Sequence, residues 1–133
     1  EDITNGTTVI VDRYSYSGVV YSAAKANPTL SLDWAWQPEI GLPRPDICLF
    51  LSISPEEAAK RGGFGAERYE NEAMQTRVRE LFRTIFEKQQ DVSIIDAGKS
   101  IDEVSREIQS AVAGCIARLD ETGALRKLEP LAN

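Results

Sequence analysis

Short runs of β-branched and apolar residues alternate along this chain with segments of helical pattern. Three runs have the composition of strands, at residues 7–11, 46–53 and 92–96. The middle run is almost continuously apolar, which is typical of a strand buried on both faces of a parallel sheet. Alternation of strands and helices favours parallel pairing through right-handed crossovers. The sequence therefore predicts an α/β fold with a parallel sheet flanked by helices.

Caps, chain breaks and apolar spacing predict the helices. Ser54 with Glu57, and Ser100 with Glu103, have the spacing of capping boxes. The predicted helices cover residues 15–26, 32–37, 55–61, a segment from about residue 71, and 101–119. Residues 1–120 are predicted to form one domain, followed by a frayed tail over 121–133. Trp34 and Trp36 are predicted as core anchors rather than base-stacking platforms.

Composition excludes several functions. Fifteen basic against 21 acidic residues give a net charge of −6, which argues against binding to nucleic acid or to an anionic membrane. The chain has no histidine, which excludes Ser-His-Asp and Cys-His nucleophiles and His-ligated zinc. No apolar run approaches the roughly 20 residues of a membrane span. Cys48 and Cys115 have apolar neighbours, as buried free thiols do in a reducing compartment, the cytoplasm or the nucleus.

Charged residues follow the predicted strands where ligands bind in parallel sheets, at the carboxyl ends. Asp12 and Arg13 come directly after the first run, and residues 96–99 follow the third. A guanidinium binds phosphate oxygens in bidentate fashion, and a carboxylate holds a water of magnesium. The Asp12–Arg13 pair therefore suits a phosphate with a metal ion. A local ion pair that closes the strand is the alternative.

A second charged segment surrounds the glycines at residues 62–65. Arg61 and Arg68 flank it, and closing loops of this kind exclude water from phosphoryl-transfer sites. An ordinary linker between two helices, with solvated charges, is the alternative.

Taken together, these segments resemble the thymidylate kinase family, and its eukaryotic branch in particular. The resemblance rests on residues 9–25 (VIVDRYSYSGVVYSAAK), 32–34 (LDW), 37–46 (QPEIGLPRPD) and 63–70 (GFGAERYE). It extends from about residue 8 to about residue 113, with the motifs in the family's order and close to its spacing.

The resemblance implies a P-loop nucleoside-monophosphate kinase fold and transfer of the γ-phosphoryl group of ATP to thymidine monophosphate with Mg²⁺. It also implies a homodimer through the helix over residues 15–26. Phosphoryl transfer depends on positioning and positive charge, so a chain without histidine fits this chemistry. The resemblance implies that Asp12 holds the metal ion through water and that Arg13 binds the acceptor and transferred phosphates. It implies that thymidylate is bound by Tyr14, Ser17, Gly18, Tyr21, Tyr69 and Gln75. It implies that ATP is bound by Arg61, Arg68, Lys99 and Ile101.

The chain departs from the family in one respect. It contains no Gly-x-x-x-x-Gly-Lys-Ser/Thr, the loop that cradles the donor phosphates. We therefore expect the C-terminal part of such a kinase, inactive by itself and with an uncovered apolar face where the phosphate-loop strand would lie. A non-catalytic nucleotide-binding or interaction domain is the alternative, and a kinase for another base stays open.

Overall fold

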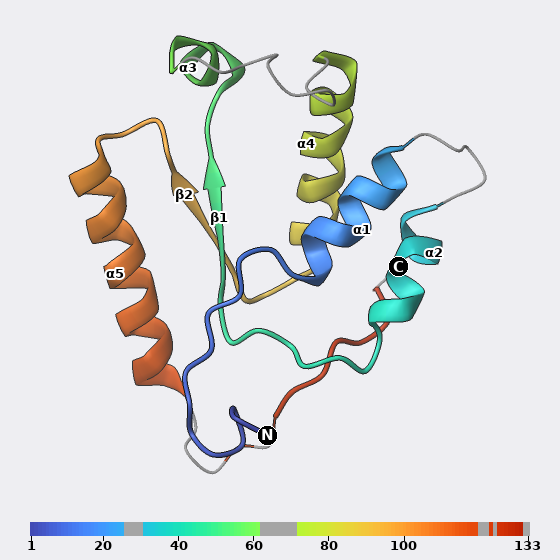
Figure 1. Cartoon of the computed structure of the whole chain (residues 1–133), viewed down its shortest axis with the longest axis vertical. Coiled ribbons are helices and arrows are strands. Elements are labelled where there is room, and N and C mark those ends of the chain that lie inside the picture. The colour runs from blue at the N-terminus through green and yellow to red at the C-terminus, as the bar shows by residue number, and fades with distance from the viewer. Residues whose placement is uncertain (26–30, 62–71, 120–122, 124, 132–133) are drawn as a thin grey trace. The chain divides into compact units, whose positions relative to one another are not determined.

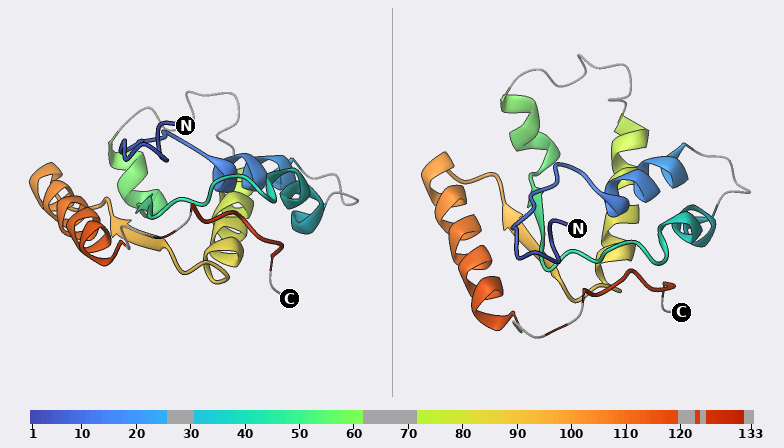
Figure 2. Two further views of the ribbon diagram at one scale, coloured as in Figure 1. Left: turned by 90° about the horizontal axis from the view of Figure 1, so that it is seen from below. Right: turned by 60° about the horizontal axis from the view of Figure 1, so that its bottom comes forward.

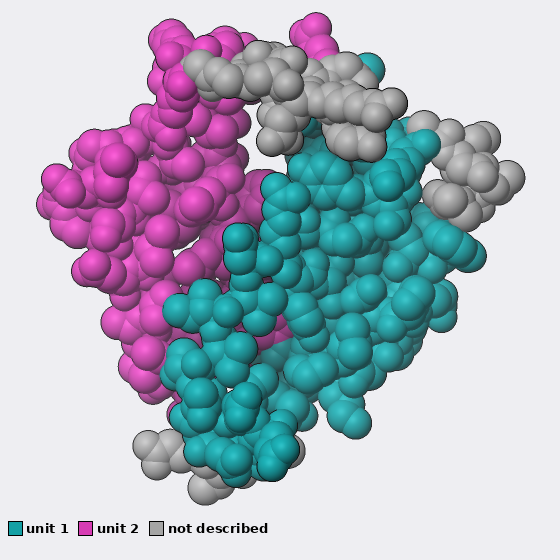
Figure 3. Space-filling view, in the orientation of Figure 1, with its two compact units in different colours: residues 1–44, 73–88, 124–133 teal, residues 45–72, 89–123 magenta. Residues whose placement is uncertain are grey.

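The structure, a computed structural model, describes residues 1–25, 31–61, 72–119, 123 and 125–131 (Figure 1). The elements in chain order are α1 (Ser15–Ala24), α2 (Leu32–Trp36), the 3₁₀ turn η1 (Gln37–Glu39), β1 (Cys48–Ser52), α3 (Pro55–Lys60), α4 (Glu72–Phe86), β2 (Val92–Asp96) and α5 (Ile101–Arg118). They form two compact units (Figure 3). The first unit comprises residues 1–44, 73–88 and 124–133, and the second unit comprises residues 45–72 and 89–123.

A parallel sheet organises the second unit. β1 pairs with β2 in a register that runs from Cys48 opposite Val92 to Ser52 opposite Asp96. The backbone N–H of Ala97 donates to the carbonyl of Ser52 at 2.7 Å and extends the ladder beyond β2. α5 runs beside β2 (Figures 1 and 2). The predicted class, α/β with a parallel sheet flanked by helices, is confirmed.

The sheet is less buried than the sequence predicts. Ile95 is 5% exposed, but Leu51 is 51% and Ile94 63% exposed. The prediction of a middle strand buried on both faces is therefore wrong for β1. Whether other elements pack on both faces of a sheet depends on the tertiary structure, and an apolar run in the sequence does not determine it. Leu51 pairs with Ile95, so Leu51 and Ile94 lie on opposite faces of the sheet, and their exposure does not define the one uncovered apolar face that the sequence predicts.

Two serines cap helices of the second unit as predicted. Ser54 Oγ accepts from the backbone N–H of Glu57 at 3.2 Å, and the Glu57 carboxylate pairs with Lys60. Ser100 Oγ accepts from the N–H of Glu103, whose carboxylate accepts from the Ser100 N–H at 3.0 Å in return. The predicted capping box is thus complete at α5, whereas at α3 the serine caps the helix but the Glu57 carboxylate pairs with Lys60, so the predicted box is wrong there.

Both cysteines carry free thiols, as predicted. Cys115 on α5 is buried and Cys48 on β1 is half-buried. Burial raises the pKa of the Cys48 thiol above its ordinary value. No helix of the described residues has the length and apolar character needed to cross a membrane.

Aromatic side chains form the core of the first unit. Tyr16 of α1 stacks on Trp36 of α2, with ring centroids 5.8 Å apart, and meets Phe86 of α4 edge-on at 5.9 Å. Trp36 is 1% exposed, and Val20 of α1 and Ile85 of α4 are fully buried. Trp34 is 57% exposed, so its prediction as a core anchor is wrong. Residues two apart on a helix do not share a face, and α2 buries the face that carries Trp36.

The end of the chain belongs to this unit. Residues 126–129 lie against the segment after η1, where the backbone of Leu128 accepts from Gly41 N–H at 2.9 Å and donates to Leu42 at 2.8 Å. Trp36 Nε1 donates to the carbonyl of Glu129 at 2.8 Å, and the Leu128 side chain is 2% exposed. The predicted fraying is therefore wrong for residues 126–129. Backbone hydrogen bonds hold this segment in place, and the weak pattern of its side chains did not indicate them.

The predicted strand at residues 7–11 is also wrong. The segment forms no strand within the described residues, and Val9, Ile10 and Val11 are 49%, 93% and 56% exposed. β-branched residues favour a strand because they pack well on a sheet, and this preference has no effect unless a neighbouring strand pairs with them.

Candidate functional site

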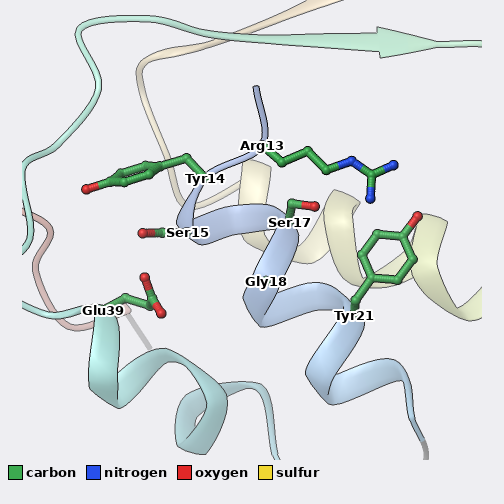
Figure 4. Close-up of a pocket in the computed structure, with 7 residues that line it drawn as sticks. All are labelled: Arg13, Tyr14, Ser15, Ser17, Gly18, Tyr21 and Glu39. Atoms are coloured by element: carbon green, nitrogen blue, oxygen red, sulfur yellow. The ribbon is translucent and has the colours of Figure 1, made fainter. Parts of the chain in front are cut away.

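A groove in the first unit surrounds the start of α1 (Figure 4). Its volume is about 450 Å³, within the range of small-molecule sites. The residues that line it are Arg13, Tyr14, Ser15, Ser17, Gly18, Tyr21 and Glu39. Five of these seven, all except Ser15 and Glu39, are residues that the sequence predicted for the site.

Arg13 enters the groove from an unusual backbone conformation. Its φ is 64°, the one positive value for a non-glycine residue in the described chain. Residues held in such sparsely populated regions cluster at functional sites. The guanidinium carbon lies 5.8 Å from the centroid of the Tyr21 ring, a cation–π contact. Figure 4 shows both side chains on the same side of α1.

The start of α1 differs from the starts of the capped helices. Ser31, Ser54 and Ser100 cap the helices that follow them, and acidic residues occupy the first turns of those helices. α1 has neither a side-chain cap nor an acidic residue in its first turn. No residue of α1 itself therefore compensates the positive end of its dipole, and the groove there is lined by one cation, Arg13, and one carboxylate, Glu39.

Tyr14 fixes one wall of the groove, because its hydroxyl donates to the carbonyl of Pro43 at 3.0 Å. Ser15 and Glu39 are the lining residues that sequence reasoning missed. Ser15 is 6% exposed, and its hydroxyl has no hydrogen-bond partner among the described residues. Glu39 is the one carboxylate residue among the described residues that line the groove. It lies inside the QPEIGLPRPD motif, which supported the family resemblance but was not used to predict a residue of the site.

The predicted ATP residues that the structure describes lie in the second unit. Arg61 follows α3, and its Nη2 donates to the carbonyl of Ala97 at 2.7 Å and to that of Lys99 at 3.5 Å. The Lys99 ammonium pairs with Glu107 of α5, and this hydrogen bond raises the pKa of Lys99 above its ordinary value. Ile101 begins α5 and is 88% exposed. The structure therefore brings Arg61 to the loop that carries Lys99 and leads to Ile101.

Asp12 and Gln75 are not among the described residues that line the groove. Asp12 is exposed and directly precedes Arg13, and Gln75 is half-buried on α4. Arg68 and Tyr69 lie outside the described residues. The described part of the chain has no cluster of three potential metal-ligating side chains. Asp12 still fits Mg²⁺, because protein sites for this ion commonly supply one or two carboxylates and leave other positions to water and substrate phosphates.

The chain thus combines a parallel α/β fold with a groove that Arg13 lines. The family model for thymidylate kinase matches residues 1–108. The chain belongs to the thymidylate kinase family.

Curated relatives and a solved structure agree with this assignment. The chain is 43% identical to thymidylate kinase of Dictyostelium discoideum over 97% of this chain and 56% of that protein. It is 46% identical to the human thymidylate kinase over 82% of this chain and 51% of that protein. The structure of thymidylate kinase from Candida albicans superposes with a TM-score of 0.77 at 32% identity, over 93% of this chain and 62% of the other. The chain thus spans about half the length of the curated relatives that it matches.

Proposed function

We propose that this chain supplies the acceptor-binding part of a thymidylate kinase. In the proposed reaction, a phosphate oxygen of thymidine monophosphate attacks the γ-phosphorus of ATP, and thymidine diphosphate and ADP are the products. The observation that carries the proposal is the groove at the start of α1, where Arg13 adjoins an uncapped helix end. Membership of the family supports thymidylate as the acceptor.

The residues of the groove have different proposed roles in binding the acceptor. Arg13 binds the acceptor phosphate, and its permanent positive charge balances the negative charge of that group during transfer. Ser17, Gly18 and Tyr21 form the wall for the nucleoside, with Tyr14 at the rim. Gln75 and Tyr69 would close the site from the lid side, as the resemblance to the family implies. These side chains bind and orient the acceptor, and positioning of this kind is the main contribution of a protein to phosphoryl transfer.

ATP is the proposed donor, and Mg²⁺ is the proposed cofactor. The metal ion, when bound, neutralises charge on the phosphates, and Asp12 would hold one of its waters. The loop over residues 97–101 would receive the adenine, with Arg61 and Arg68 beside it. In the structure, the Arg61 guanidinium donates to this loop's own carbonyls.

We propose that the 133 residues bind thymidylate but do not transfer phosphate by themselves. The sequence contains no Gly-x-x-x-x-Gly-Lys-Ser/Thr to supply amides and lysine to the donor phosphates. The same observation favours the second candidate function, a nucleotide-binding or interaction domain without catalysis. The two functions differ in whether the site contributes to turnover when a phosphate loop is supplied.

A homodimer through the helix at residues 15–26 is part of this proposal. Six residues of α1, including Tyr16, Val19 and Val20, are buried within the first unit. The exposed residues of this helix that do not line the groove include Ser22 and Lys25. A contact between two copies would therefore use these exposed residues, and sedimentation at several concentrations measures whether it forms.

Calorimetric titration of the 133-residue chain with thymidine monophosphate tests the proposal. We expect saturable binding that Arg13→Ala weakens about ten- to hundred-fold, because hydrogen bonds to charged groups have that magnitude. Arg79→Ala, which removes an exposed arginine of α4, is the matched control and leaves binding unchanged. Absence of binding, or equal binding by the Arg13→Ala variant, would show that the groove is not the acceptor site.

A further inference from the structure

Two aromatic contacts fix the ring of Tyr21 beside Arg13. One face of the ring receives the guanidinium, with 5.8 Å from the guanidinium carbon to the ring centroid. Phe82 of α4 meets the same ring edge-on, with a centroid distance of 6.4 Å. Tyr21 therefore lies between a charged group of the groove and a helix of the core.

The contact continues from Phe82 into the buried core. Phe82 stacks on Phe86 at 5.4 Å, and Phe86 meets Tyr16 edge-on at 5.9 Å. Tyr16 stacks on Trp36, which is 1% exposed. A continuous series of aromatic contacts thus connects the groove with the most buried part of the first unit. Closely packed rings of this kind have little freedom to move.

Arg13 itself is exposed and long, so its guanidinium would sample many rotamers if it were held only by its backbone. Its φ of 64° fixes the direction in which the side chain leaves the backbone. The Tyr21 ring contacts the opposite end of the side chain. The Arg13 side chain is therefore constrained both at its backbone and at its guanidinium before a ligand binds, and such preorganisation strengthens binding.

We propose that Tyr21 is a positioning residue that acts through Arg13, in addition to forming part of the wall of the groove. Its ring holds the guanidinium where the phosphate of the acceptor nucleotide binds. This inference rests on the proposed function, because it takes a nucleoside monophosphate as the ligand. A positioning role affects only the phosphate-dependent part of the affinity, whereas a wall contact affects nucleoside and nucleotide alike.

The preference for phosphate is measured as the Kd of thymidine divided by the Kd of thymidine monophosphate, each by calorimetry on the full chain. We expect Tyr21→Leu to reduce this ratio about two- to five-fold, the magnitude of an exposed cation–π contact. Tyr21→Phe keeps the ring and keeps the ratio. In an Arg13→Ala background, Tyr21→Leu has no further effect on the ratio, because the group through which it acts is gone.

A second substitution preserves the packing of the ring. Tyr21→3,4,5-trifluorophenylalanine keeps a ring of similar shape but weakens the negative potential of its face, so we expect the ratio to fall relative to Tyr21→Phe. Near-ultraviolet circular dichroism of each variant checks that the aromatic core is intact.

Two results overturn the inference while the proposed function stands. One is an unchanged ratio in both the Leu and the trifluorophenylalanine variants. The other is an equal reduction by Tyr21→Leu with and without Arg13. If the unaltered chain binds neither ligand, or binds both equally, the proposed function fails and the inference fails with it.

Discussion

The guanidinium of Arg61 donates to the carbonyl of Ala97 at 2.7 Å and connects the end of α3 to the loop between β2 and α5. The same loop is held by Asp96, whose carboxylate accepts from Gly98 N–H at 2.9 Å. The Arg61 guanidinium thus donates to main-chain carbonyls of the proposed adenine loop. The resemblance to the family implied a different contact, with the nucleotide itself.

Removal of the Arg61 guanidinium should loosen this loop. We expect Arg61→Ala to speed amide hydrogen exchange at Gly98 and Lys99, because their loop loses a hydrogen bond from another element. Lys60→Ala is the control, since Lys60 pairs with Glu57 within α3 and does not donate to the loop. Equal exchange in the two variants would contradict the role assigned to Arg61.

The end of the chain should contribute to stability. Leu128 is 2% exposed, and Leu125 is 44% exposed. Truncation of a buried leucine to alanine costs about 2–5 kcal/mol. We therefore expect Leu128→Ala to lower the free energy of unfolding by about that amount, measured by urea titration, while Leu125→Ala lowers it by less than about 1 kcal/mol. Equal effects would contradict the packing of this segment.

Local signals in the sequence were reliable where a structure depends on neighbouring residues. The serine caps at Ser54 and Ser100 depend on groups within one helical turn, and the structure confirms both. β1 and β2 were predicted within two residues of their bounds. The groove residues Arg13 to Tyr21 are close in sequence, so one motif contains most of the site.

The sequence did not predict the features that depend on contacts between residues far apart along the chain. Residues 7–11 have strand composition, but no strand in the described residues pairs with them. Residues 126–129 lack a clear pattern, yet main-chain bonds to the segment after η1 order them. Glu39 reaches the groove from η1, and its place there depends on how η1 packs near α1. None of these partners is identifiable from a local window of sequence.

The backbone of Arg13 should be strained. At a φ of 64°, a side chain costs about 1–2 kcal/mol that glycine does not incur. We expect Arg13→Gly to have a free energy of unfolding about 1 kcal/mol higher than Arg13→Ala, because both lose the guanidinium and only alanine keeps a Cβ. If Arg13→Gly is the less stable variant by chemical denaturation, the left-handed conformation is not present in solution.

The capping box of α5 should make stability depend on pH. Hydrogen bonds from Ser100 lower the pKa of the Glu103 carboxyl below its ordinary value. The folded state therefore gains stability above the ordinary glutamate pKa of about 4.3, and loses it as the pH falls through the lowered folded value. We expect the destabilisation caused by Glu103→Ala to be larger at neutral pH than in acid.

Circular dichroism during urea unfolding measures this difference at each pH. Asp102→Ala removes another carboxylate of the same helical turn and is the matched control, because Asp102 is not part of the capping box. A destabilisation by Glu103→Ala that is independent of pH would contradict the bond between the ionised carboxylate and Ser100.

The groove at the start of α1 is proposed to bind the acceptor nucleotide. Two-dimensional NMR of the isotopically labelled chain, titrated with thymidine monophosphate, locates the binding site residue by residue. We expect saturable shifts concentrated at the amides of residues 13–21 and at Glu39, with inorganic phosphate shifting the signals of Arg13 and Ser15 among them. Shifts confined to other residues, or no shifts at millimolar nucleotide, would contradict this proposal.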